Sequence, residues 1–112
     1  MLESIERRLT NRPYRVESST KVRGISGVVH EFTLRIIKKN KVIYLDRVTD
    51  PEGLLLSYCK AIDLEDPVII IAPSDQVKTY GFSSGTRIRN IVILSEEDPK
   101  LLDSLIDIIE KS

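Results

Sequence analysis

The sequence predicts an α/β fold in which a three-stranded antiparallel meander continues into parallel strands, with helices on the faces of the mixed sheet. Two β-rich runs, 28–37 and 42–48, flank a short polar loop centred on Asn40, which is the pattern of a hairpin. The run 68–72 is wholly apolar, as in a strand covered on both sides. Helical and strand patterns then alternate, so we expect right-handed crossovers between parallel strands in the second half.

The first strands follow a short helix. Residues 2–10 carry apolar side chains at helical spacing, and the predicted helix ends before Pro13. Residues 14–20 alternate in polarity and predict a strand with one solvated face, followed by a connection over 21–27. In the next strand, one face is predicted to be buried and consists of His30, Phe32, Leu34 and Ile36.

The second half supplies the crossover helices. Asp50 and Pro51 predict a helix start, with Asp50 as the N-cap. The predicted buried stripe of this helix comprises Leu54, Leu55, Tyr58, Cys59 and Ile62, widened by Leu56 and Ala61. A short turn of helix, capped at 74–75 and ended at 80–81, precedes a last strand over 87–94. Ser95, Asp98 and Pro99 predict the start of a final helix. The predicted order is αβββαβ(α)βα, in one domain spanning 1–112.

The composition is that of a soluble protein. Apolar residues make up 41% and charged residues 30% of the chain, which is ordinary for a globular domain. No stretch approaches the roughly 18 apolar residues of a membrane span, and the first residues lack the pattern of a signal peptide. The single cysteine, Cys59, is expected to be a buried, reduced thiol. We therefore expect a cytoplasmic protein with no membrane partner.

The zero net charge hides an asymmetry between the two halves of the chain. Residues 1–47 hold 11 Lys and Arg against 5 Asp and Glu, whereas residues 48–112 hold 6 against 12. Such polarity is typical of a nucleic-acid-binding face or of a self-complementary association surface, although charges that intermix on a solvated surface produce it too. If DNA is the partner, the first candidates for phosphate contacts are Arg7, Arg8, Lys38, Lys39 and Lys41.

A local string carries a resemblance to a known superfamily. Residues 26–33 read Ser-Gly-Val-Val-His-Glu-Phe-Thr. This string resembles the Ser-Gly-x-x-His-x-Phe-Asp string of archaeal proteins in the PD-(D/E)XK superfamily, the restriction-endonuclease-like proteins that include Holliday-junction resolvases. The predicted element order is similar to the core of that superfamily over nearly the whole chain.

The resemblance implies a degenerate active site. In such nucleases two carboxylates hold Mg²⁺, which prepares a water nucleophile, and a lysine two residues after the third-strand acid positions that water. The resemblance places Thr33 at the second-strand acid, Asp46 at the third-strand acid and Val48 at the lysine. Glu6, or Glu3, would be the acid of the first helix, and Asp46 would be the remaining metal ligand.

Three functions follow for this chain. The first is a catalytically inactive nuclease-like protein that needs no cofactor and binds DNA or a DNA-associated protein, because Thr33 and Val48 replace the acid and the lysine. The second is a divergent Mg²⁺-dependent DNA nuclease in which Asp46 pairs with a helix glutamate or, after a shift of register, with Glu31. The third is a structural homodimerisation module.

Two further expectations concern single residues and association. His30 is the only histidine, so it is expected to be a hydrogen-bonded structural residue rather than part of a metal cluster. A homodimer is favoured over a monomer, with its basic half against the acidic half of its partner. Apolar side chains such as Leu56, Ile108 and Ile109 are expected to supply most of the binding.

Overall fold

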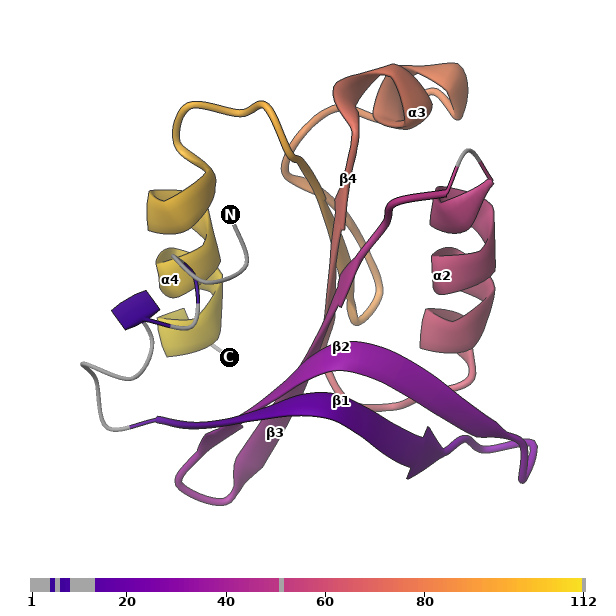
Figure 1. Cartoon of the computed structure of the whole chain (residues 1–112), viewed down its shortest axis with the longest axis vertical. Coiled ribbons are helices and arrows are strands. Elements are labelled where there is room, and N and C mark those ends of the chain that lie inside the picture. Colours follow the sequence, from indigo (N-terminus) through magenta and orange to yellow (C-terminus); the bar gives the residue numbers. More distant parts are fainter. Residues whose placement is uncertain (1–4, 6, 9–13, 51, 112) are drawn as a thin grey trace.

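The computed structural model describes residues 5, 7–8, 14–50 and 52–111, and Figure 1 shows the arrangement of the chain. The strands are β1 (Arg15–Arg23), β2 (Val29–Lys38), β3 (Lys41–Arg47), β4 (Val68–Ala72), β5 (Thr86–Ile88) and β6 (Ile91–Ser95). The helices are α2 (Gly53–Ile62), α3 (Ser74–Thr79) and α4 (Leu101–Lys111). Of the predicted first helix, Ile5, Arg7 and Arg8 are helical, and its other residues lie outside the described part of the chain.

The predicted mixed α/β architecture is confirmed. The six strands form one sheet in the order β1-β2-β3-β4-β6-β5. Strands β1, β2 and β3 are antiparallel, whereas β3, β4 and β6 run parallel to one another. Helix α4 covers one face of the sheet and α2 the other, while α3 lies beyond the ends of the central strands (Figure 1). Each parallel step therefore crosses over through a helix, as the alternation in the sequence predicts.

Two apolar cores fill the space between the sheet and its helices. The core under α4 includes Ile36, Leu45 and Ile69 with Leu105 of the helix. The core under α2 includes Tyr44, Ile70 and Ile93 with Leu54 of the helix. Alternate residues of β3 and β4 thus serve opposite cores, which is why both strands are apolar on both faces.

The predicted hairpin of β2 and β3 forms, and the strands differ from the prediction in two details. Strand β1 continues to Arg23, through part of the segment predicted to be a connection. Lys38 pairs with Lys41, so the hairpin turn consists of only Lys39 and Asn40. Lys39 has φ 57°, the left-handed conformation that a tight two-residue hairpin requires.

The single last strand predicted over 87–94 is wrong. Ile88 pairs with Ile91, and the chain reverses between β5 and β6 through Arg89 and Asn90. Arg89 takes φ 54°, which allows this reversal. The three-residue β5 therefore becomes the edge of the sheet, and only β6 continues the parallel part.

Helix α2 differs from its prediction in both its start and its orientation. It begins at Gly53, and the backbone N–H of Leu54 donates to Oε1 of Gln76 at 3.1 Å, so a side chain from α3 takes the place predicted for Asp50. Its buried residues are Leu54, Ser57 and Ala61. Among residues predicted to be buried, Leu55, Leu56, Cys59 and Ile62 are exposed. The predicted buried thiol is therefore wrong.

Helix α4 begins at Leu101, after a turn that Asp98 closes by accepting the Lys100 backbone N–H at 2.9 Å. Its buried side chains include Ile109, which is fully enclosed in the core under α4. The prediction that Ile109 contributes to a dimer interface is therefore wrong. Within the described ranges, no helix is both long and apolar enough to cross a membrane.

Candidate functional site

The sequence-predicted pair Thr33 and Asp46 is in direct contact at the end of β3. The backbone pairing of β2 with β3 runs from Lys38 back to Leu34. At the next residue, Thr33, the side chain takes over the bonding to β3. Oγ1 of Thr33 accepts the backbone N–H of Arg47 at 3.0 Å and donates to Oδ1 of Asp46 at 3.1 Å. The hydroxyl therefore satisfies a backbone donor where β2 leaves β3.

Where β2 separates from β3, the inward-facing side chains of β2 switch from one face of the sheet to the other. Leu34 of β2 packs in the core under α4, whereas Phe32 packs in the core under α2, with its ring centroid 5.2 Å from that of Tyr44. Strict alternation would have placed Phe32 and Leu34 on one face, as the sequence predicts. On β1, Ser19 has φ 50° between the paired residues Ser18 and Thr20. The β1–β2 ribbon twists here and extends toward α2 (Figure 1).

Helix α2 supplies the other partners of the Asp46 carboxylate. Oγ of Ser57 donates to Oδ2 of Asp46 at 2.6 Å, and Nζ of Lys60 lies 2.7 Å from the same oxygen. The Asp46 side chain is 12% exposed and that of Lys60 is 27% exposed. Both carboxylate oxygens are thus engaged, and the negative charge is neutralised by a cation at contact distance.

Lys60 is fixed by two further contacts. Its ammonium group donates to the backbone carbonyl of Glu31 at 2.6 Å and lies 4.7 Å from the ring centroid of Phe32. The ammonium therefore connects α2 to β2 and to β3, and the aromatic face adds a cation–π attraction. These contacts hold the cation against Asp46 rather than leaving it to reach into solvent.

We call Asp46, Thr33, Ser57 and Lys60 the Asp46 cluster. The remaining predicted site residues do not join it. Val48 is buried in the core under α2, close to the backbone of Gly53, where an added Cβ would lie 2.5 Å from its Cγ1. Glu3 and Glu6 lie outside the described residues. Among the described residues, no three His, Cys, Asp or Glu side chains come together as a metal-binding group. Glu31 is exposed, two residues before Thr33 along β2.

A hollow of about 300 Å³ opens beside the cluster, at the carboxyl end of β3. It is lined by Asp46, Arg47, Val48, Thr49, Asp50, Gly53, Leu56, Ser57 and Lys60. The guanidinium of Arg47 pairs with Glu96, which follows β6, at 2.8 Å. Carboxyl ends of parallel strands are where open α/β sheets usually bind ligands. Here Asp46 is paired with Lys60 and Arg47 with Glu96.

The predicted phosphate-binding residues are divided between two places. Lys38, Lys39 and Lys41 lie at the β2–β3 turn, and Nζ of Lys38 donates to the carbonyls of Ile109 and Glu110 at the end of α4, at 3.2 and 2.6 Å. Its charge thus stabilises the carboxyl terminus of that helix. Lys39 and Lys41 are exposed.

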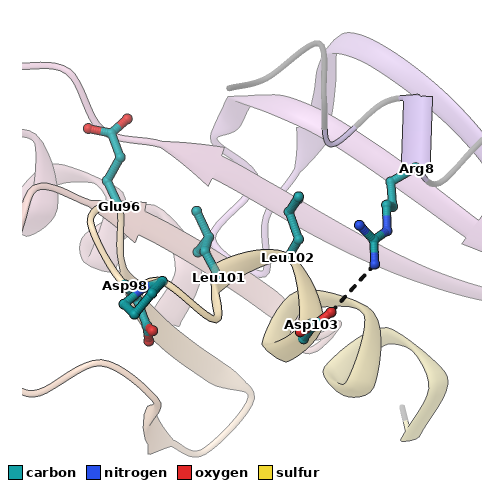
Figure 2. A pocket seen from close by; sticks show the side chains of 7 residues that line it. Arg8, Glu96, Asp98, Leu101, Leu102 and Asp103 are labelled. Carbon is teal, nitrogen blue, oxygen red and sulfur yellow. Dashed lines mark hydrogen bonds and ion pairs between the residues drawn. The ribbon is translucent and has the colours of Figure 1, made fainter.

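Arg7 and Arg8 belong to the first helical segment. The guanidinium of Arg8 lies 3.5 Å from the carboxylate of Asp103 on α4 (Figure 2). Both groups border a hollow of about 380 Å³ that is also lined by Glu96, Asp98, Pro99, Leu101 and Leu102. Three carboxylates in that lining make it a poor place for a phosphate group.

The lysine-bearing turn and the Asp46 cluster lie at opposite ends of β3. Lys41 begins this strand and Asp46 is its last residue but one, so about 17 Å of extended backbone separates them. The structure therefore does not bring Lys39 and Lys41 to the carboxylate that resembles a nuclease acid. A ligand held by the lysines would contact the turn rather than the cluster.

His30 has a structural environment, as predicted. Its Nε2 lies 2.7 Å from Oδ2 of Asp63, which follows α2. The same carboxylate accepts the hydroxyl of Ser26 at 2.7 Å and the Ser26 backbone N–H at 2.9 Å. The Ser26 hydroxyl, followed by His30, lowers the pKa of Asp63 below its ordinary value of 3.8. Two residues of the resemblance string, Ser26 and His30, thus fasten the β1–β2 loop and the start of β2 to the end of α2.

Sequence reasoning missed Ser57 and Lys60, although a helix was predicted where both lie. They are three positions apart in the sequence, so they lie on the same side of α2 as Leu54 and Ala61. A buried aspartate on the preceding strand was the signal, because such a group requires donors from the element that covers it. The apolar residues of α2 surround the helix and concealed this polar side.

Comparisons with known proteins yield a fold likeness. Neither the protein-family models nor the curated proteins match this chain. One similar solved structure is the crystal structure of a protein of unknown function, AF1548, with a TM-score of 0.55 and 12% sequence identity. The alignment covers 96% of this chain and 64% of that chain, so this chain spans under two thirds of its length. The likeness shows a shared α/β fold.

Proposed function

We propose that this chain is a catalytically silent relative of the PD-(D/E)XK nucleases that acts by binding. One observation carries the proposal: the only matching acid of the third strand, Asp46, is held in an ion pair with Lys60 and in hydrogen bonds with Thr33 and Ser57. The lysine beside this acid thus comes from α2 rather than from position 48, and its ammonium contacts the carboxylate directly.

This arrangement opposes metal-assisted hydrolysis. Mg²⁺ binds carboxylate oxygens at about 2.1 Å and usually keeps several waters. To reach Asp46 it would have to displace the ammonium of Lys60 from Oδ2, and the neighbouring position of the second carboxylate is taken by the neutral hydroxyl of Thr33. A single neutralised carboxylate provides little attraction for a divalent ion.

DNA is the partner that the charge distribution favours. Lys39 and Lys41 are exposed at the β2–β3 turn, and Arg15, 75% exposed, lies on β1 opposite Ile37 at the same end of the sheet. A narrow turn that carries several cations fits against a phosphate backbone without reading bases. Binding at this end leaves the Asp46 cluster away from the nucleic acid.

The absence of cleavage is tested with the purified chain on labelled duplex and branched DNA, with and without Mg²⁺. We expect no Mg²⁺-dependent products. Cleavage that disappears in Asp46→Asn would overturn the proposal and favour a divergent nuclease. Lys60→Met is the matched variant, because it removes the ammonium from Oδ2 of Asp46 while the carboxylate and its hydrogen bonds from Thr33 and Ser57 remain.

Binding is tested by titrating the same DNA at several salt concentrations. Each phosphate contact contributes about 0.9 to the slope of log affinity against log salt for duplex DNA. We expect the double variant Lys39→Glu/Lys41→Glu to lower the affinity and reduce that slope. The control is Lys78→Glu/Arg87→Glu, at two exposed positions on α3 and β5, because it makes the same charge change on other parts of the fold. Equal effects of the two variants would contradict binding at the turn.

A second candidate function, pairing of two copies, is favoured by one observation. Of the seven large hydrophobic residues that are exposed among those described, six lie on α2 or in the β1–β2 loop region and one is Tyr80. Such clustering is typical of a protein interface. It lies on different elements from the lysine-bearing turn, so the two functions can coexist.

A further inference from the structure

The outward side of α2 is apolar where a surface helix normally carries charge. Leu55, Leu56 and Ile62 are 49%, 60% and 51% exposed, and Cys59 is also exposed. The polar residues Ser57 and Lys60 instead turn toward Asp46. The Asp46 carboxylate requires donors, and the orientation of α2 that supplies them leaves Leu55 and Leu56 facing solvent while Leu54 remains in the core. An ordinary surface helix presents polar side chains on its outward side.

The β1–β2 loop extends the same surface at the end of α2. The backbone N–H of Ile25 donates to the carbonyl of Asp63 at 2.8 Å, and the Ile25 side chain is 68% exposed. Gly24 lies so close to Asp63 that an added Cβ would lie 2.0 Å from its Oδ2. The loop is thus fastened to the residue that follows Ile62, and it presents an exposed Ile25 at this end of α2. We define the α2 face as Leu55, Leu56, Cys59, Ile62 and Ile25.

We infer that the α2 face is the interface of a homodimer in which two α2 helices pack antiparallel across a two-fold axis near Cys59. The inference rests on the second candidate function, and it adds the surface and the geometry. Leu55, Cys59 and Ile62 follow one another at spacings of four and three residues and form a single stripe. In an antiparallel pair, Leu55 of one copy meets Ile62 of the other, and the two Cys59 side chains meet at the axis.

The stripe is self-complementary, which favours a second copy over a different partner. Each of its side chains is uncharged, and the stripe is apolar at both ends, so a two-fold operation places apolar groups on apolar groups throughout. An interface with a different protein usually carries charges that select the partner and the register. Between Leu55 and Ile62 the one charged residue is Lys60, and its ammonium is held against Asp46.

The size of the surface agrees with what a stable dimer needs. The exposed parts of the α2 face amount to on the order of 500 Å², within the range of the largest apolar patch of a typical monomer. A standard interface buries about 800 Å² per partner, of which roughly 60% is apolar. The patch is therefore large enough to supply the apolar part of a standard interface.

The mass of the protein in solution tests the inference. Light scattering across the micromolar range is expected to give twice the 12.7 kDa monomer mass at the upper concentrations. The double variant Leu56→Glu/Ile62→Glu is expected to remain a monomer at the same concentrations. Tyr80→Glu is the matched control, because Tyr80 is an exposed apolar residue outside the α2 face, and it is expected to remain a dimer. Urea unfolding of each variant establishes that it is folded.

Cys59 provides an independent measurement of the geometry. Mild oxidation of the wild-type chain is expected to give a disulfide-linked dimer through Cys59, and the Leu56→Glu/Ile62→Glu variant is expected to give little. A wild-type monomer mass at every concentration overturns both dimerisation and the interface. A dimer that persists in the double variant overturns the α2 interface alone and leaves dimerisation in place. If the wild-type chain is monomeric and still binds DNA, the DNA-binding proposal stands without the dimer.

Discussion

The ammonium of Lys60 lies 2.7 Å from the carboxylate of Asp46, and it reaches that position from α2 rather than from β3. The pair is largely shielded from water and is completed by hydroxyl donors from Thr33 and Ser57. Such a pair holds its helix in one orientation, because either charge left alone would be costly to keep out of water. It therefore links the candidate site to the exposure of the α2 face.

Replacing Lys60 by methionine is expected to destabilise the fold. The change keeps the side-chain volume but leaves the Asp46 carboxylate without its cation. Breaking a buried pair costs about 3–5 kcal/mol, and the partial exposure of Lys60 reduces the expected loss in the free energy of unfolding to about 2 kcal/mol. Urea unfolding measures it.

A double variant separates the charge effect from the other contacts of Lys60. In the Lys60→Met background, Asp46→Asn removes the unpaired charge, so part of the lost stability is expected to return. Lys78→Met, on the exposed side of α3, is the control and is expected to change the free energy of unfolding by less than about 0.5 kcal/mol. If Asp46→Asn made the Lys60→Met chain still less stable, the ion-pair account would be contradicted.

Thr33 is expected to matter through its hydroxyl group. Thr33→Val keeps the shape but leaves the Arg47 backbone N–H without its acceptor and Asp46 without one donor. The expected loss is about 1–3 kcal/mol. Thr33→Ser retains the hydroxyl and is expected to lose less. A larger loss in Thr33→Ser than in Thr33→Val would mean that the methyl group, and not the hydroxyl, is what the fold requires.

How far the sequence predicts the strands depends on the length of the runs beside each turn. The two hairpins with two-residue turns, β2–β3 and β5–β6, both turn through a basic residue with positive φ followed by asparagine. These turns are Lys39-Asn40 and Arg89-Asn90. Long β-rich runs flank the first, so alternation reveals it. The second joins a three-residue β5 to β6, and so short a strand leaves no recognisable period. Neither turn has the glycine that marks many such hairpins.

Helix α2 shows why half of the candidate site was not predictable. Apolar residues occur on every side of this helix, so hydrophobicity does not determine which side faces the sheet. The structure decides through the Asp46 carboxylate, which draws Ser57 and Lys60 inward. That preference depends on a contact between two elements and is absent from the local pattern. Thr33 and Asp46 were predicted because the resemblance places them at the two acid positions of adjacent strands.

Gln76 is expected to stabilise the start of α2 from outside the helix. Its Oε1 accepts the Leu54 N–H, and its Nε2 donates to the Asp50 carbonyl at 2.7 Å. Gln76→Ala removes both bonds and is expected to cost about 1–2 kcal/mol in the free energy of unfolding. Gln76→Glu keeps the acceptor, so it is expected to recover part of that loss. Hydrogen exchange of the Leu54 amide provides a local measurement, and its rate is expected to rise in Gln76→Ala.

The carboxylate of Asp63 is expected to link acid stability to the β1–β2 loop. Because hydrogen bonds from Ser26 and His30 lower its pKa below 3.8, the folded chain binds fewer protons here than the unfolded chain. The stabilisation is fully present above the unfolded pKa and is lost as the pH falls through the folded value. Ser26→Ala removes the largest of these effects and is expected to raise the pKa of Asp63.

The measurement is an NMR titration of the side-chain carboxyl groups, with acid unfolding followed in parallel. In Ser26→Ala, the Asp63 titration is expected to move to higher pH, and acid unfolding is expected to begin at higher pH. Ser84→Ala is the matched control: the Ser84 hydroxyl lowers the pKa of Asp98, so that variant should move Asp98 and leave Asp63 in place. An Asp63 titration unaltered by Ser26→Ala would mean that the hydroxyl does not hold this carboxylate in solution, and the fastening of the loop to α2 would then depend on His30 and the backbone bonds.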